Sequence, residues 1–146
     1  MRNLFTYLPV LFVLILAASC AKSPGPAIGY HPKESAPAKE RVFFPFDSAM
    51  LTEEAQDSIR LNSKWLLTEP DTYIILEGHC DDIGKNEYNV ELGDRRARAV
   101  KAAMMEEGVL QERIIMVVSY GSGRPLSDGR KIEDLRKNRR VEFVVR

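Results

Sequence analysis

The fold of this chain is decided by a run of β-branched and apolar residues, Thr72-Tyr73-Ile74-Ile75-Leu76-Glu77, and by the helix pattern that follows it. The run shows little alternation of polar and apolar positions, which predicts a central strand covered on both faces. A turn follows at Asp82-Ile83-Gly84-Lys85, and Asn86 is expected to cap a helix over Glu87–Glu107 that Gly108 closes. Together they predict a right-handed crossover between parallel strands.

Shorter elements flank this unit on both sides. Val42–Phe46 predicts a short aromatic strand, and Thr52 is a typical N-cap for a helix that Pro70 ends. Ile114–Val118 and Val141–Val145 predict two further strands, with a short helix near Ile132–Lys137 between them. The sequence therefore predicts one α/β domain, in which helices cover one face of a small mixed four-stranded sheet.

Both expected helices carry a stripe of mostly small or apolar residues at helical period. The stripe of the first helix consists of Ala55, Ile59, Asn62 and Leu66, and the core stripe of the long helix of Gly93, Ala97, Val100 and Met104. A neighbouring stripe on the long helix consists of Asn89, Leu92, Arg96, Ala99 and Ala103. Arg96 is the one charge on that stripe, so a guanidinium at the edge of the core needs a partner.

Asp81 is the nearest candidate partner, because the short turn brings the end of the central strand beside the first turns of the helix. Two interpretations follow. In one, an Asp81–Arg96 ion pair is structural and holds the turn against the helix. In the other, the two groups hold opposite ends of a bound zwitterion: Arg96 binds a carboxylate through two hydrogen bonds, and Asp81 binds an ammonium group.

Composition and residue spacing argue against nucleic-acid binding, catalysis and metal binding. The 146 residues carry a formal net charge of zero with mixed signs, whereas nucleic-acid proteins usually show a basic stripe. His79 and Cys80 are neighbours in a strand and point to opposite faces, so they cannot form a catalytic dyad. His31 lies in a linker, which leaves no second ordered histidine for a metal. We expect no catalytic residue, metal or cofactor, a hydrogen-bonded His79 and a buried Cys80.

Residues 1–20 have the pattern of an export signal, with a lone charge at Arg2 and an apolar run over Leu8–Leu16. The end of this segment, Leu16-Ala17-Ala18-Ser19-Cys20, resembles the lipobox of bacterial lipoproteins, although the family usually has leucine at the position of Ala17. The resemblance implies a signal peptide over residues 1–19 and acylation of Cys20. An ordinary signal peptide cut near Ala18 is the alternative.

The residues after Cys20 predict a tether. Residues 21–40 contain four prolines among Ala, Ser, Gly and Lys, and so cannot bury enough apolar surface to fold. The expected organisation is a signal peptide over 1–19, a lipidated cysteine and disordered tether over 20–40, and a folded domain over 41–146. By resemblance to lipoproteins, Ala21 and Lys22 favour the outer membrane.

The domain also carries a set of motifs that occur in order and with matching gaps: Phe44-Pro45-Phe46-Asp47-Ser48, Glu77-Gly78-His79-Cys80-Asp81, the helix segment Tyr88–Ala97, Ser119-Tyr120-Gly121 and Lys137-Asn138-Arg139-Arg140-Val141. This set resembles the OmpA-like peptidoglycan-binding domain family over residues 41–146. The resemblance implies an OmpA-like β-α-β-α-β-β sandwich. It further implies that the domain binds the diaminopimelate stem peptide of peptidoglycan non-covalently and without enzymatic activity.

The resemblance also assigns ligand-binding positions. Asp81 and Arg96 match the family's ligand-gripping acid and arginine, Asn89 and Leu92 match pocket residues, and Phe46-Asp47-Ser48 matches the loop that closes the pocket. Diaminopimelate has an amine and a carboxylate on one carbon at its free end, which suits the zwitterion interpretation. One position departs from the family: Ile83 stands where an arginine is usual, so a second ligand arginine is missing and weaker binding is expected.

By the same resemblance, the protein is expected to be an outer-membrane lipoprotein with its domain in the periplasm, linking that membrane to the wall and supporting envelope integrity and cell division. Its expected partners are peptidoglycan, the outer membrane and the Tol system. The alternative is an envelope scaffold that acts mainly through protein partners of the Tol type, with Asp81–Arg96 a structural ion pair.

Overall fold

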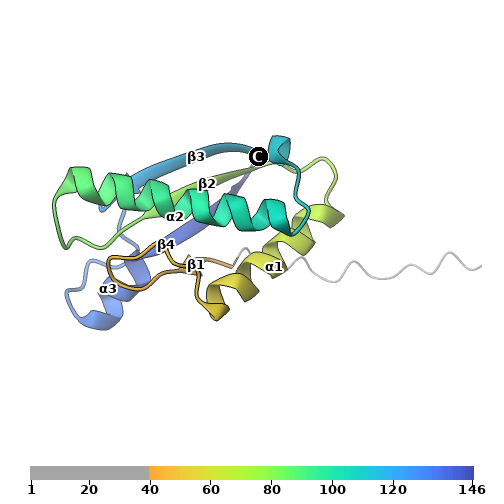
Figure 1. The fold of residues 1–146 in the computed structure, drawn as a ribbon. Coiled ribbons are helices and arrows are strands. Elements are labelled where there is room, and N and C mark those ends of the chain that lie inside the picture. Colours follow the sequence, from red (N-terminus) through yellow and green to blue (C-terminus); the bar gives the residue numbers. More distant parts are fainter. Residues whose placement is uncertain (1–39) are drawn as a thin grey trace, which may run out of the picture. The chain divides into compact units, whose positions relative to one another are not determined.

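The structure, a computed structural model, describes residues 40–146 (Figure 1). The expected signal peptide, Cys20 and all but the last residue of the expected tether lie outside these residues. The elements are β1 (Val42–Phe43), α1 (Glu53–Thr68), β2 (Ile74–His79), α2 (Asn86–Glu106), a 3-10 turn (Gln111–Arg113), β3 (Ile114–Gly121), α3 (Ile132–Asn138) and β4 (Arg140–Val145). No helix within this part of the chain is long and apolar enough to cross a membrane.

The four strands form one mixed sheet in the order β1-β4-β2-β3. β2 and β3 are parallel neighbours, as the crossover pattern predicted, and β4 lies antiparallel between β2 and β1. β1 is shorter than expected: the backbone N–H of Phe44 still donates to the carbonyl of Arg139, but Pro45 has no N–H to continue the ladder. The predicted α/β class and mixed sheet are confirmed.

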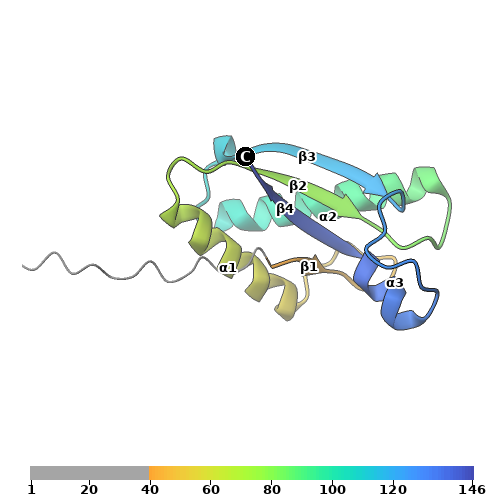
Figure 2. The same cartoon turned by 180° about the vertical axis from the view of Figure 1, so that it is seen from behind.

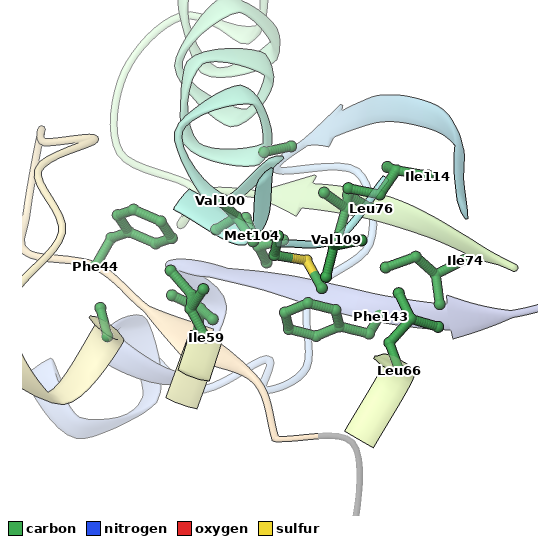
Figure 3. Close-up of a cluster of buried hydrophobic side chains, with 14 residues drawn as sticks. Phe44, Ile59, Leu66, Ile74, Leu76, Val100, Met104, Val109, Ile114 and Phe143 are labelled. Carbon is green, nitrogen blue, oxygen red and sulfur yellow. The ribbon is translucent and has the colours of Figure 1, made fainter. Parts of the chain in front are cut away.

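The core lies between one face of the sheet and the helices α1 and α2, as Figure 3 shows for side chains of both helices and of β2 and β4. Both predicted core stripes are buried there, and Thr52 caps α1 as expected, its Oγ1 accepting from the Ala55 N–H at 3.2 Å. Figure 2, drawn from behind, shows the strands in front of α2.

The prediction that β2 is covered on both faces is wrong. Ile74, Leu76 and Gly78 are buried toward the helices, whereas Ile75 and Glu77 on the opposite face are only partly buried. The reason lies in the connections, because α1 and α2 return across the same side of the sheet. The run of apolar residues without alternation therefore indicates a strand that has neighbouring strands on both sides. It does not indicate that both faces of this strand are covered.

α2 begins one residue earlier than expected. Asn86 lies inside the helix, and Lys85 is the N-cap without a side-chain capping bond. The carbonyl of Lys85 accepts the first helical bond, from the N–H of Asn89 at 3.0 Å, which places Asn86 in the first turn. The expected closure at Gly108 is observed, with φ of 91°.

α2 and β2 touch backbone to backbone at a pair of glycines. A Cβ atom on Gly78 would lie 2.0 Å from the carbonyl oxygen of Gly93, and a Cβ atom on Gly93 would lie 2.3 Å from the hydroxyl oxygen of Ser119. Only glycine permits so close an approach. The contact sets the position of the following helical turn, which carries Arg96, over the end of β2.

The end of β2 also buries a histidine on the face away from α2. His79 is 2% exposed, and its ring stacks on that of Tyr120 with 5.6 Å between centroids. Neither ring nitrogen has a hydrogen-bond partner within the described residues, so the expectation of a hydrogen-bonded His79 is wrong. Burial, reinforced by the charges of Arg140 and Arg124, lowers the pKa of His79 from 6.5 to about 4.

Replacing Gly78 by alanine is expected to push α2 away from the sheet and to lower the free energy of unfolding by about 3 kcal/mol, because the added methyl group meets backbone that cannot rotate away. Urea denaturation measures this loss. Gly123→Ala is the matched control, since its Cβ meets only the Tyr120 carbonyl at 3.2 Å. Equal losses in the two variants would contradict the close-contact explanation.

His79 is expected to make the domain less stable in mild acid. The folded protein keeps this imidazole neutral down to about pH 4, whereas the unfolded chain protonates it near pH 6.5. Between these values the unfolded state binds the extra proton, so stability falls as pH falls, by up to roughly 3 kcal/mol for this group.

The His79→Phe variant keeps the stacked ring and loses the titration. Urea unfolding of both proteins at pH 7.5 and pH 4.5 measures the difference. Wild type should lose more stability than the variant, while losses from carboxylates such as Glu142 are common to both. The same loss in both proteins would show that His79 does not titrate in this window.

Candidate ligand-binding site

Arg96 reaches from α2 under the end of β2, and its side chain is wholly buried at 0% exposure. Its Nη1 donates to the carbonyl of His79 at 2.9 Å and to Cys80 Sγ at 3.3 Å. Its other edge faces the loop after β1: Nε donates to the carbonyl of Ser48 at 2.8 Å, and Nη2 to the carbonyl of Pro45 at 3.0 Å. The guanidinium therefore joins α2, β2 and this loop.

The expected ion pair between Asp81 and Arg96 does not form. Among residues 40–146, Arg96 bonds only to neutral acceptors, and no carboxylate pairs with it. Burial lowers the pKa of Arg96, while the nearby charges of Asp81 and Asp47 act in the opposite direction. A charge that is fully removed from water without a paired anion is costly, so this arginine is an unusual structural element.

Asp81 pairs instead with Arg139, from the junction between α3 and β4. Arg139 Nη1 lies 3.1 Å from Asp81 Oδ2, and both side chains are almost fully buried, at 9% and 5% exposure. The Nε of Arg139 donates to the carbonyl of Phe44, and its guanidinium lies 6.0 Å from the ring centre of Phe46. Asp81 Oδ1 forms no hydrogen bond within the described residues.

Arg139 was not among the predicted site residues. It belongs to the basic cluster Arg136-Lys137-Asn138-Arg139-Arg140, and the flanking acids Glu133 and Asp134 favour a solvated helix end whose arginines pair with acids of the sheet. The expected pairing with an acid of the sheet is observed for Arg140, whose Nε lies 2.7 Å from Glu142, but the Arg140 side chain is buried and not solvated. Arg139 is buried as well, and its partner is Asp81. The available signal was the motif Lys137–Val141, which formed part of the family resemblance but was given no role in the pocket.

Asn89 and Leu92 are both buried on the α2 stripe that carries Arg96. Asn89 Nδ2 donates to the carbonyls of Asp81 and Ile83, each at 3.2 Å, so it holds the turn that carries Asp81. Leu92 is 5% exposed and has no polar group to offer. Here Asn89 positions the acid, and Leu92 contributes packing beside Arg96.

The segment Phe46-Asp47-Ser48 folds over the two arginines. Asp47 has φ of 51°, in the left-handed region, and accepts a hydrogen bond from the hydroxyl of Tyr88 at the start of α2. Ser48 contributes its carbonyl to Arg96, while its hydroxyl accepts the N–H of Met50. The segment therefore lies against both arginines, and the carbonyl of Ser48 occupies part of one edge of the Arg96 guanidinium.

Cys80 is buried as expected, at 2% exposure. Its thiol donates to the carbonyl of Asn89, and burial raises the pKa of Cys80, which keeps it protonated and unreactive. Within the part of the chain that the structure describes, no group of three His, Cys, Asp or Glu side chains is placed to hold a metal.

The site therefore combines two buried guanidinium groups with one buried carboxylate at the end of β2, which leaves a surplus of positive charge. An arrangement of this kind can bind an anionic group at the arginines and a cationic group at Asp81, without a nucleophile or a base for turnover. It is suited to recognising a zwitterion.

Comparison with known proteins identifies the family of this chain. The profile of the OmpA family matches residues 43–139. The peptidoglycan-associated lipoprotein of Legionella pneumophila is 33% identical over 156 residues, which cover 89% of this chain and 88% of that protein. The peptidoglycan-associated lipoprotein of Brucella suis is 38% identical over 88 residues, and there the match spans 60% of this chain and only 52% of the relative.

Among solved structures, the crystal structure of the peptidoglycan-associated lipoprotein from Burkholderia pseudomallei superposes with a TM-score of 0.69 and 32% identity, over 74% of this chain and 91% of that one. The similarity in sequence and fold covers the described domain. This chain is a homologue of the peptidoglycan-associated lipoproteins, and it belongs to the OmpA family.

Proposed function

We propose that this protein binds the diaminopimelate-containing stem peptide of peptidoglycan without altering it, and so attaches the outer membrane to the cell wall. The observation that carries the proposal is Arg96, which is wholly buried and has no carboxylate partner among the described residues. A buried cation that bonds only to backbone carbonyls and a thiol gains a strong partner when a carboxylate arrives.

The free end of diaminopimelate supplies that carboxylate beside an amine. The Nε and Nη2 atoms of Arg96 now donate to the carbonyls of Ser48 and Pro45, which occupy the edge that a carboxylate binds through two parallel hydrogen bonds. Binding would shift the segment Pro45-Phe46-Asp47-Ser48 and replace the carbonyls of Pro45 and Ser48 by the carboxylate. Exposed Phe46 then closes over the ligand, in the role that the resemblance gives to this loop.

The amine of the same carbon is assigned to Asp81. Arg139 engages Oδ2 and leaves Oδ1 for the ammonium group. Arg139 also supplies a second guanidinium close to the site, although Ile83 occupies the position where relatives of this family usually have an arginine. Asn89 and Leu92 support the two ligand-binding groups from α2, since the first fixes the turn and the second packs beside Arg96.

Binding without turnover agrees with the family, whose members bind peptidoglycan and are not enzymes. The attachment to the membrane is proposed from the sequence: cleavage before Cys20, acylation of its thiol, and residues 21–40 as the tether between lipid and domain. Several acyl chains hold a protein firmly, because each buried methylene contributes about 0.8 kcal/mol. A role in division with proteins of the Tol type is proposed by analogy with the family.

The proposal predicts that the full chain binds a diaminopimelate stem peptide and discriminates against the lysine analogue, which lacks the distal carboxylate. The loss is expected to be at least about thirtyfold, since it leaves a buried charge without its partner, worth ~2 kcal/mol. Asp81→Asn and Arg96→Lys should weaken binding of the first peptide by a similar factor. Isothermal titration calorimetry measures all of these affinities.

Arg98→Ala is the matched control, because Arg98 lies on α2 with its side chain 69% exposed and, within residues 40–146, pairs only with Asp94. It should bind as wild type does. Circular dichroism establishes that each variant is folded. Folded wild-type protein that binds neither peptide would contradict the proposal and favour a scaffold that acts through protein partners.

Attachment through Cys20 predicts that Cys20→Ser protein moves from the outer-membrane fraction to the soluble periplasmic fraction, since the acyl chains are lost. Immunoblotting of the separated fractions measures this. The Cys80→Ser variant serves as control, because Cys80 is buried in the domain and should leave the location unchanged. Retention of the Cys20→Ser protein in the membrane would contradict lipid anchoring.

A further inference from the structure

A hollow of about 440 Å³ lies beside the Asp81–Arg139 pair and extends away from the zwitterion site described above, with which it shares Phe46 and Arg139. Three segments form it: the loop after β1, the turn after β2, and α3. Its lining includes Phe46, Ile83, Ile132, Arg136 and Arg139. Because Arg139 belongs both to the hollow and to the ion pair with Asp81, the two sites are continuous.

The walls of the hollow are apolar and open to solvent. Phe46 is 57% exposed, Ile83 47% and Ile132 63%, although the three come from separate segments of the chain. Single exposed apolar side chains are ordinary on a protein surface, but several gathered around one concave site indicate a binding surface. Ile83 contributes here because it replaces the charged residue that is usual in the family.

The rim of the hollow is cationic. Arg136 is exposed in the last turn of α3, and its side chain forms no hydrogen bond or ion pair with any residue between 40 and 146. Arg139 uses Nη1 and Nε for Asp81 and the Phe44 carbonyl, and no hydrogen bond of Nη2 is found among the same residues. The hollow therefore suits a small apolar group that carries a carboxylate.

We propose that this hollow is a second subsite, which binds the terminal D-alanine of the tetrapeptide stem, with its methyl group against Ile83 and Ile132 and its carboxylate at Arg136. The inference rests on the proposed function. In the tetrapeptide, D-alanine is joined to the far end of diaminopimelate, within on the order of 10 Å of the free amine and carboxylate. A ligand held at Asp81 thus places its D-alanine within reach of the hollow.

The subsite gives this chain a preference that the zwitterion site alone does not provide. The tripeptide, which ends at diaminopimelate, leaves the hollow empty, whereas the tetrapeptide fills it. A fitted methyl group in an apolar pocket is worth roughly tenfold in affinity, so the tetrapeptide should bind about ten times more tightly than the tripeptide. A tetrapeptide with a C-terminal amide should lose part of this advantage, because it lacks the negative charge.

The test is calorimetric titration of the full chain, in detergent solution, with the tripeptide, the tetrapeptide and the tetrapeptide amide. The variants Ile83→Ser and Ile132→Ser change exposed side chains, so they should fold, bind the tripeptide as wild type does and lose most of the preference for the tetrapeptide. Arg136→Gln should remove the difference between acid and amide. Leu110→Ser is the control, since Leu110 is 65% exposed and lies beyond the far end of α2.

The outcomes separate the subsite from the proposed function. Equal binding of tripeptide and tetrapeptide by wild type, or a preference that survives in both serine variants, would overturn the subsite and leave the zwitterion site in place. No binding of any of the three peptides by folded protein would overturn both. Tighter binding of the tetrapeptide that is lost in the two serine variants and kept in Leu110→Ser would establish the subsite.

Discussion

The guanidinium of Arg96 is the interaction on which the rest of the site depends. It is buried completely and bonds to the carbonyls of Pro45, Ser48 and His79, which belong to two segments that lie far apart in the sequence. The side chain can be there because α2 lies against β2 at Gly78 and Gly93. One close backbone contact thus positions the charge, and the charge holds the loop after β1 over the strand end.

The same arrangement prepares the site for a ligand. Carbonyl oxygens satisfy the hydrogen-bonding capacity of Arg96 but not its charge, so the site remains short of an anion. Asp81 does not fill this role, because Arg139 holds it at 3.1 Å. The described domain therefore keeps two guanidinium groups and one carboxylate in a buried cluster. The proposed ligand has a carboxylate and an ammonium group on one carbon. The carboxylate would pair with Arg96, and the ammonium group would bind the remaining oxygen of Asp81.

Much of the fold could be predicted from the sequence, because local patterns carry it. The Thr52 cap, the buried stripes of α1 and α2, the closure at Gly108 and the crossover between β2 and β3 all follow from residue spacing. The errors concern properties that depend on how neighbouring helices and strands pack, such as the burial of a strand face. The run Thr72–Glu77 was expected to be covered on both faces, and the helices instead cover one, since spacing along a strand does not say where the connecting helices return.

The sequence by itself determined which segments become strands and helices, that Arg96 would lie at the edge of the core, and that Cys80 would be buried. Only the tertiary structure decided the partners of the charges. Arg139 and Asp81 are separated by 58 positions, and they meet because β4 lies beside β2 in the sheet and begins where β2 ends. The apolar hollow between Phe46, Ile83 and α3 likewise forms from three distant segments. Periodicity reports the environment of one element, whereas a binding site is made where several elements end together.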